Sequence, residues 1–279
     1  MAARFLSAGW RANAGPWALL RTVVVFVYLF SLGPILITAA VSFNQTNRSF
    51  FPPRGFSLRW WERAFAPEWI DPLLFSLKLG SLTALFSTLL ALPLAFALFR
   101  YRFRGREALV ALTLGPLMLP TLVTGVGLLQ LFQYIGWREY LGFTALLVGH
   151  VVICLPFAVR TVGISLHTLP PNVELAAASL GAPPLRVLTT VTLPLLLPGL
   201  VSGWLFAAIL SFNEFTASLF VTAQNTQTLP VALYNYVREY ADPSMAAISV
   251  MYIVVTATLL TFANVFLGLG KVLNVEHSR

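Results

Sequence analysis

The chain is poor in cysteine and in charge. Cys154 is the single cysteine among 279 residues, so no intramolecular disulfide can form, and its apolar surroundings suit a small buried hydrophobe. Charged residues make up 10% of the chain and hydrophobic residues 58%, which is more apolar surface than a soluble domain of this length could bury. The apolar runs lack the alternation of outer-membrane strands. The composition therefore indicates a helical membrane protein.

Motifs for catalysis and nucleotide binding are also missing. No GxxxxGK[ST] phosphate loop occurs, and the only Gly-Lys pair, at 270–271, has no glycine-rich loop before it. His150, His167 and His277 are far apart, and scattered histidines are more often structural than metal ligands. No nucleophile and base stand in a recognisable pattern. We therefore expect no enzyme activity, no metal site and no cofactor in this chain.

Six apolar runs are long enough to cross a bilayer as helices. The first run is too long for the apolar core of a signal peptide and has no convincing cleavage site, so we interpret it as an uncleaved span. We expect an all-α polytopic protein with one transmembrane domain over residues 1–279. The predicted spans lie near 20–43, 74–99, 108–133, 144–167, 195–220 and 244–270.

Basic residues predict the orientation of these spans. With the N-terminus inside, the inner segments hold ten basic and three acidic residues, whereas the outer segments hold six of each. The excess of arginine on the inner side follows the positive-inside rule. Both termini, the 100–106 loop and the 168–194 loop are therefore expected in the cytoplasm. Topology accounts for the net charge of +8, so nucleic-acid binding is not required to explain it.

Proline and glycine interrupt several of the runs. We interpret each proline first as a structural kink, although broken helices also surround transport pathways. Gly199 and Gly203 form a GxxxG pattern that predicts a close helix-packing face. The interrupting residues are Pro93 in the second run, Pro116, Pro120, Gly125 and Gly127 in the third, and Pro156 in the fourth.

One acidic residue, Glu214, falls inside a predicted span. A carboxylate there is costly unless it is paired, hydrated or used. Two interpretations remain open for Glu214 and the neighbouring Asn213. They could contribute to a substrate path, or Glu214 could be a carboxylate that is paired within the bundle or solvated at the outer interface.

Aromatic residues gather in the two long outer loops. The loop at about 44–73 and the loop at about 221–243 each predict a short helix. The aromatic side chains could belong to an interfacial belt, which we favour, or to a docking surface for an outside partner. The residues are Trp60, Trp61, Phe65 and Trp69 in the first loop and Tyr234, Tyr236 and Tyr240 in the second.

The 168–194 loop carries a patterned helix–turn–helix. Asn172 is a candidate N-cap, Glu174 suits the first turn, and Gly181 is a natural stop after about two turns. Ala176 and Ala177 leave this first helix thin enough to enter a groove of a partner. A short helix of this kind between two spans predicts a docking element for a soluble partner.

The spacing of the loop resembles that of the inner-membrane permeases of binding-protein-dependent ABC importers. Their pattern is EAA, three residues, Gly, nine residues, then I-x-L-P. Here Gly181 holds the glycine place and Leu193-Pro194 the final pair, while Val191 stands for the isoleucine. Ala176 and Ala177 hold the alanine places. Leu175 occupies the glutamate place, with Glu174 one residue earlier.

The resemblance implies a type I importer permease fold whose loop acts as a cytoplasmic coupling helix. Its ATPase-coupling residues would be Glu174, Ala176, Ala177, Gly181, Leu193 and Pro194. It also implies two ATP-binding cassette subunits that hold ATP and Mg, a second and non-identical permease subunit, a periplasmic binding protein, and the bacterial inner membrane.

The segments LMLPTLVTGVGLL and SFNEFTASLFVT resemble the spermidine/putrescine subgroup, which implies a polyamine or a related small polar solute. That subgroup often has two acids after Ser-Phe, where this chain has Asn213-Glu214. Related permeases carry ferric iron, aminoethylphosphonate, sulfate or amino-acid-like solutes. A self-sufficient secondary transporter or channel is the alternative, although the six runs show no obvious inverted repeat.

Overall fold

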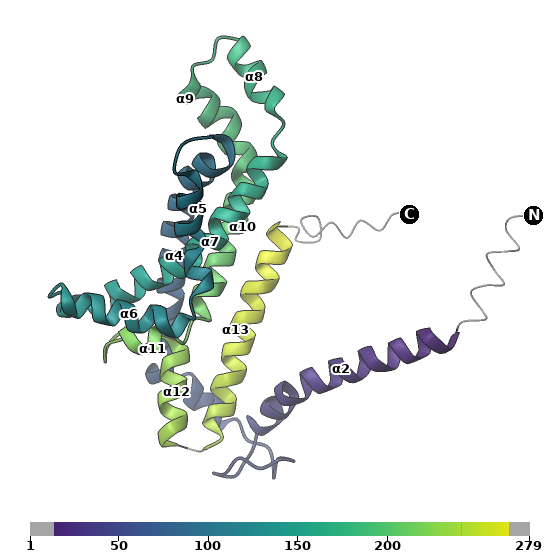
Figure 1. Ribbon diagram of the computed structural model, residues 1–279. Helices are drawn as coiled ribbons and strands as arrows, with labels where there is room; N and C mark the ends of the chain where they lie inside the picture. Colours follow the sequence, from purple (N-terminus) through teal and green to yellow (C-terminus); the bar gives the residue numbers. More distant parts are fainter. Residues whose placement is uncertain (1–13, 241, 268–279) are drawn as a thin grey trace, which may run out of the picture. The chain divides into compact units, whose positions relative to one another are not determined.

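The computed structural model describes residues 14–240 and 242–267, and the elements in this part of the chain are helices (Figure 1). The described residues form two compact units. Unit 1 contains residues 14–65, 240 and 242–252, and unit 2 contains residues 66–239 and 253–267.

Unit 1 contains a long apolar helix followed by a folded loop. Its helices are α2 (Ala14–Val41), α3 (Arg59–Ala64) and the first part of α13 (Ser244–Leu267). The loop is organised around the buried Asn44, whose amide donates to the carbonyls of Arg48 and Phe50. Trp60 donates its indole N–H to the Asn44 carbonyl at 2.8 Å and is itself buried. Trp60 therefore packs inside the loop and does not belong to an interfacial belt.

Unit 2 is built around three long helices, α4 (Pro67–Arg100), α7 (Phe143–Thr168) and α10 (Leu193–Phe212). Many of the buried residues of α4 are small and recur every three or four positions, which lets α7 and α10 approach closely. They are Ser76, Gly80, Thr83, Ala84, Ser87, Ala91 and Ala95.

Glycines on α10 confirm the packing face that the GxxxG pattern predicts. A Cβ at Gly199 would collide with the Ser165 side chain of α7, and a Cβ at Gly203 would lie 3.7 Å from Ala158 of the same helix. The GxxxG face of α10 thus lies directly against α7.

The third apolar run is sharply bent. It consists of α5 (Arg106–Leu114), η1 (Gly115–Met118) and α6 (Thr121–Tyr134), and the chain bends by 106° between its two halves. Pro116 lies in η1 and Pro120 immediately precedes α6, so the prolines mark the break. In contrast, α4 continues through Pro93 and α7 continues through Pro156.

The fifth run begins and ends earlier than the sequence predicts. A continuous stretch, Pro184–Phe212, contains α9 (Pro184–Val187), the π-helical η3 (Leu188–Thr192) and α10. After a break at 213–217, the chain continues as α11 (Ser218–Val221). The expected span at 195–220 is therefore not one uninterrupted helix.

Unit 2 also contains η2 (Arg138–Tyr140), α8 (Pro171–Ser179), α12 (Leu229–Glu239) and the second part of α13. α12 is the short helix expected for the second outer loop, and Tyr236 packs edge-on against the buried Trp69. By length and composition, five helices could cross a membrane, or six if the bent pair is one span. The expectation of a polytopic all-α protein is confirmed.

Candidate functional site

The patterned loop forms a helical hairpin at one end of unit 2. Figure 1 shows α8 and α9 projecting beyond the turn that joins α4 to α5. Its first helix, α8, begins at Pro171 and is preceded by Pro170, with no side-chain capping bond at that end. The expectation that Asn172 caps this helix is wrong, because proline already fits the first helical position without an N–H to satisfy.

Gly181 ends α8 as the sequence predicts. Its φ is +85°, and its N–H donates to the Ala178 carbonyl at 2.9 Å. The next N–H, that of Ala182, donates to the Ala177 carbonyl at 3.2 Å. These two bonds satisfy carbonyls that a helix end leaves unpaired, in the arrangement of a Schellman motif. The left-handed backbone explains why glycine stands here.

Glu174 points back toward the body of unit 2. One carboxylate oxygen lies 3.0 Å from the Arg100 guanidinium at the end of α4, and the other accepts a 2.8 Å hydrogen bond from Thr192. The side chains of the ion pair are 27% and 23% exposed, so the contact is partly shielded from water. Glu174 therefore ties α8 to both α4 and η3.

The hairpin joins α10 through one widened helical turn. Pro194 has no N–H to donate to the carbonyl four residues earlier, and its ring would crowd that carbonyl in a regular α-helix. The π-helical η3 lies directly before Leu193 and Pro194. We attribute the widened turn to this proline, since inserted turns of this kind relieve such crowding.

Several of the exposed side chains of the hairpin are apolar. Ala176 is exposed and Ala177 is half-buried. Three leucines outside the expected set of coupling residues are also exposed: Leu175 is 63% exposed, Leu180 89% and Leu185 71%. The one available signal was Leu175, which stands where the resembling family has glutamate. Exposed leucines on a projecting hairpin are typical of a protein-docking surface.

Glu214 lies in the break between α10 and α11, not within a helix. It is half-buried, and one carboxylate oxygen accepts a 2.8 Å hydrogen bond from the Ala217 N–H at the start of α11. Asn213 is exposed and donates its amide to the Ile209 carbonyl at 2.7 Å. Carboxylate and amide groups at a helix break can meet a polar solute.

A buried histidine connects the two sides of this break. His150 of α7 is fully enclosed, and its two ring nitrogens lie 2.6 Å from the Ser211 hydroxyl and 2.8 Å from the Ser218 hydroxyl. Ser218 donates in turn to the Glu214 carbonyl at 3.0 Å. The histidine thus joins the end of α10 to α11.

The two groups of candidate residues are not brought together. Glu174 and Glu214 lie near opposite ends of α10, whose 20 residues span about 30 Å. Within the described residues, no group of three or more His, Cys, Asp and Glu side chains could hold a metal ion. His277 lies outside the described residues. The candidate residues therefore form two separate regions, one at the hairpin and one at the helix break.

These features define a helical membrane component of a transport system, with a projecting hairpin at one end and a polar helix break toward the other. Residues 87–269 match the family described as binding-protein-dependent transport system inner membrane component. The chain belongs to this family and is a multi-pass inner-membrane permease of the ABC importer class.

Relatives within this family are named for different substrates. The chain is 34% identical over 241 residues to the spermidine/putrescine permease PotC of Haemophilus influenzae, covering 86% of this chain and 92% of that protein. It is 29% identical over 242 residues to the putrescine permease PotI of Escherichia coli, covering 85% of each. It is also 34% identical over 258 residues to the molybdenum permease ModB of Mycobacterium bovis, covering 88% and 93%.

Solved structures share the fold. A bacterial alginate ABC transporter in complex with its pentasaccharide-bound periplasmic protein contains a chain with a TM-score of 0.68 and 17% identity, covering 91% of this chain and 95% of that one. The MetNI methionine ABC transporter gives a TM-score of 0.58 at 20% identity, covering 71% and 94%. The expected permease fold is confirmed.

Proposed function

We propose that this chain is a permease subunit of an ATP-driven importer and that its cargo is a polyamine or a related small polar solute. The single observation that carries the proposal is the projecting α8–α9 hairpin, fixed by Glu174 and ended by Gly181, in a chain of this family. The similarity to PotC and PotI supports a polyamine. The same family membership favours this function over a self-sufficient secondary transporter or channel.

The hairpin would receive force from an ATPase subunit. Leu175, Leu180 and Leu185 provide the exposed apolar contact, while Ala176 and Ala177 keep α8 thin. Glu174 acts on the inner side of α8 and holds it to α4 and η3. Gly181, Leu193 and Pro194 set the geometry of the two hairpin ends. In this arrangement, movement of the partner is transmitted to α4 and α10.

The break after α10 would meet the solute. A polyamine carries ammonium groups, and the Glu214 carboxylate at 213–217 offers the charge that attracts them. The Ala217 N–H holds one carboxylate oxygen, which fixes the side chain while its other oxygen can accept a further bond. Asn213 adds an amide beside it. The pathway residues are therefore Glu214 and Asn213.

The importer would contain further subunits and its own cofactors. We place two ATP-binding cassette subunits on the hairpin side, where they hold ATP and Mg, so that hydrolysis is performed by these partners. A second, non-identical permease subunit completes the pathway, and a periplasmic binding protein delivers the solute. Both termini of this chain lie on the cytoplasmic side, in agreement with the distribution of arginine.

Affinity capture of the full chain tests the proposal. The tagged chain, isolated from its native membrane, should bring down an ATP-binding subunit and a second permease. The captured complex, reconstituted with its binding protein, should import radiolabelled putrescine when ATP is supplied. Import of molybdate in place of putrescine would overturn the polyamine assignment and leave the permease function intact. Ion-driven import by this chain alone would overturn both.

A further inference from the structure

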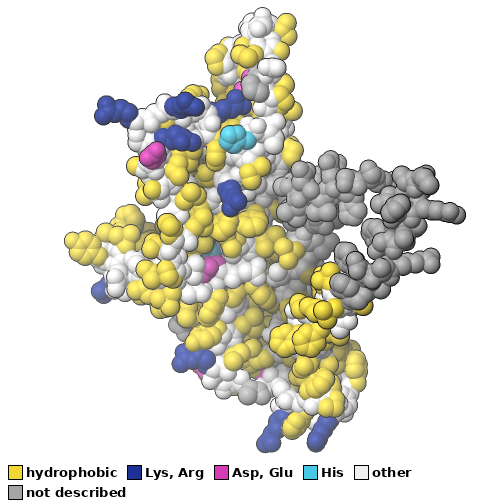
Figure 2. Space-filling view, turned by 45° about the vertical axis from the view of Figure 1, so that its right-hand side comes forward, with side chains coloured by type: hydrophobic (Ala, Val, Ile, Leu, Met, Phe, Trp, Pro, Cys, Tyr) yellow, Lys and Arg dark blue, Asp and Glu magenta, His cyan; other side chains and the backbone are white. Residues whose placement is uncertain are grey.

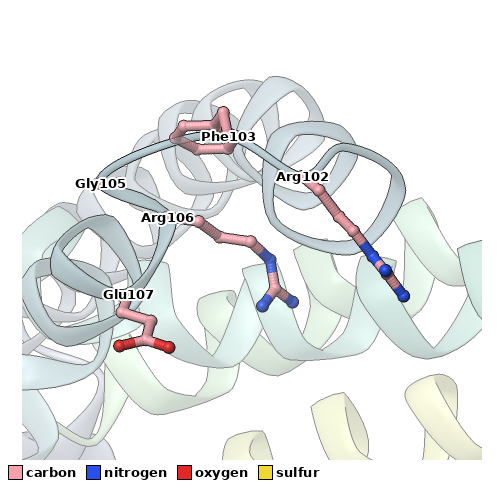
Figure 3. A pocket seen from close by; sticks show the side chains of 5 residues that line it. All are labelled: Arg102, Phe103, Gly105, Arg106 and Glu107. Carbon is pink, nitrogen blue, oxygen red and sulfur yellow. The ribbon is translucent and has the colours of Figure 1, made fainter.

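A cavity of about 370 Å³ lies at the turn between α4 and α5, close in sequence to Arg100 but lined by none of the candidate residues described above (Figure 3). It is lined by Arg102, Phe103, Gly105, Arg106 and Glu107. Figure 3 shows Arg102, Arg106 and Glu107 extending to the same side of the turn. Two guanidinium groups against one carboxylate give the cavity a net positive charge.

One of these arginines is held in place by the fold. The Arg106 Nε donates to the Leu98 carbonyl at 2.8 Å, at the last turn of α4. A guanidinium has five N–H donors, so the two terminal nitrogens of Arg106 still have donors to offer. Arg102 and Arg104 are exposed. A fixed guanidinium beside exposed ones is suited to an anion with several oxygens, such as a phosphate.

Aromatic side chains alternate with the arginines along this turn. Tyr101 is 64% exposed and Phe103 43%, and they stand between Arg100, Arg102 and Arg104. Aromatic rings are favoured at the boundary between lipid headgroups and acyl chains, and arginine is favoured among the headgroups of the inner leaflet. The alternation therefore matches the chemistry of a membrane surface more closely than that of a soluble anion.

The position of the turn agrees with this chemistry. It follows directly on α4, which is long and apolar enough to cross a membrane, and it precedes Arg106–Met118, which meets the same criterion only together with Thr121–Tyr134 as one bent span. The turn thus joins one apolar span to the first half of the next, and we expect such a turn at the membrane surface. Figure 1 shows that the α8–α9 hairpin projects farther than this turn does. Figure 2 shows Lys and Arg side chains gathered below the tip of the hairpin. A partner bound to the tip of the hairpin would not need to cover this turn. The turn would then stay open to the lipid headgroups.

We propose that the turn between α4 and α5 binds the phosphate of an anionic phospholipid. Arg102 and Arg106 contact the phosphate oxygens, Arg104 adds positive charge, and Tyr101 and Phe103 contact the glycerol and upper acyl region. Glu107 limits the affinity, because it places a carboxylate in the same cavity. The site is independent of the solute that the permease carries.

Lipid binding to the purified full chain tests this site. Dioleoylphosphatidylglycerol and dioleoylphosphatidylcholine are titrated separately into the detergent-solubilised chain, and bound lipid is counted by native mass spectrometry. Arg102→Gln/Arg104→Gln should weaken phosphatidylglycerol binding about tenfold or more and phosphatidylcholine binding much less, because the choline group already offsets the charge of its phosphate. The matched control is Arg138→Gln/Arg186→Gln, which removes two exposed arginines elsewhere in unit 2 and should bind as the parent does.

A third variant should strengthen lipid binding, whereas the double variant weakens it. Glu107→Gln should tighten phosphatidylglycerol binding severalfold, and it carries the test even if the double variant fails to fold. Soluble glycerol phosphate, added in excess, should not displace the lipid. Absence of tightening, an equal loss in the control variant, or displacement by glycerol phosphate would overturn the proposal. An unchanged lipid affinity with lost capture of the ATPase subunit would instead assign the turn to a protein partner.

Discussion

The Arg100 guanidinium lies 3.0 Å from the Glu174 carboxylate, and this contact joins the end of α4 to the first helix of the projecting hairpin. Thr192 donates to the same carboxylate at 2.8 Å, so three segments that are distant in the sequence meet at one side chain. A link of this kind can transmit a displacement of α8 to α4 and, through η3, to α10. The coupling mechanism that we propose depends on it.

Removing this link should uncouple the hairpin. Glu174→Ala leaves the Arg100 charge without its partner and should lower the stability of the fold by about 1–2 kcal/mol, because the pair is only partly shielded from water. The loss should appear as a lower melting temperature and severalfold weaker capture of the ATPase subunit. Arg100→Gln/Glu174→Ala removes both charges and should cost less than Arg100→Gln and Glu174→Ala combined. Additive losses would show that the two side chains act independently.

Two substitutions at Gly181 should distinguish the effect of the left-handed backbone conformation from the effect of steric crowding. A Cβ at this position would meet nothing within 4 Å, yet φ is +85°, which costs most residues about 1–2 kcal/mol and β-branched residues more. Gly181→Asn should therefore retain ATPase capture and uptake, whereas Gly181→Val should reduce both at equal membrane abundance. If the valine variant performs as well as the asparagine variant, the helix stop has no part in docking.

Two glycines on α6, Gly125 and Gly127, provide a test position and its control. A Cβ at Gly125 would approach the Ala217 backbone to 2.8 Å, next to the break that holds Glu214, whereas a Cβ at Gly127 would meet nothing within 4 Å. Gly125→Ala should push α6 away from α11 and lower the melting temperature and the uptake rate. Gly127→Ala should match the parent in both measurements. Equal behaviour of the two variants would contradict this packing.

The Glu214 carboxylate should attract a cationic solute. Glu214→Gln keeps an oxygen for the Ala217 N–H and removes the charge, so the break should keep its shape. Putrescine uptake should fall severalfold while complex yield and basal ATP hydrolysis stay unchanged. Glu239→Gln, which neutralises an exposed acid on α12, is the control. A fall in yield together with uptake would indicate that Glu214 stabilises the bundle instead.

The sequence predicts the parts of this fold that depend on local chemistry. Apolar runs indicate most of the spans, and Gly181 indicates the end of α8, because both follow from the properties of a few consecutive residues. The GxxxG pattern predicts the face of α10 that packs on α7. In the same way, the spacing around Gly181 and Pro194 indicates the hairpin before any contact is known.

The remaining features depend on contacts between distant segments. The end of α10 at Phe212 places Glu214 in a break, and that break is supported by His150 of another helix. No local pattern indicates that support. The pairing of Arg100 with Glu174 likewise requires the arrangement of α4 and α8. The burial of Trp60 follows from the folding of its loop around Asn44, which aromatic enrichment alone does not indicate.

Reconstituted transport tests the central claim most directly. The captured complex is placed in proteoliposomes with its binding protein outside and ATP inside, and the uptake of radiolabelled putrescine is measured beside that of the chain alone. We predict uptake that requires both the ATPase subunit and ATP, with no uptake and no ATP hydrolysis by the chain alone. Putrescine uptake by the chain without an ATPase subunit would contradict the account.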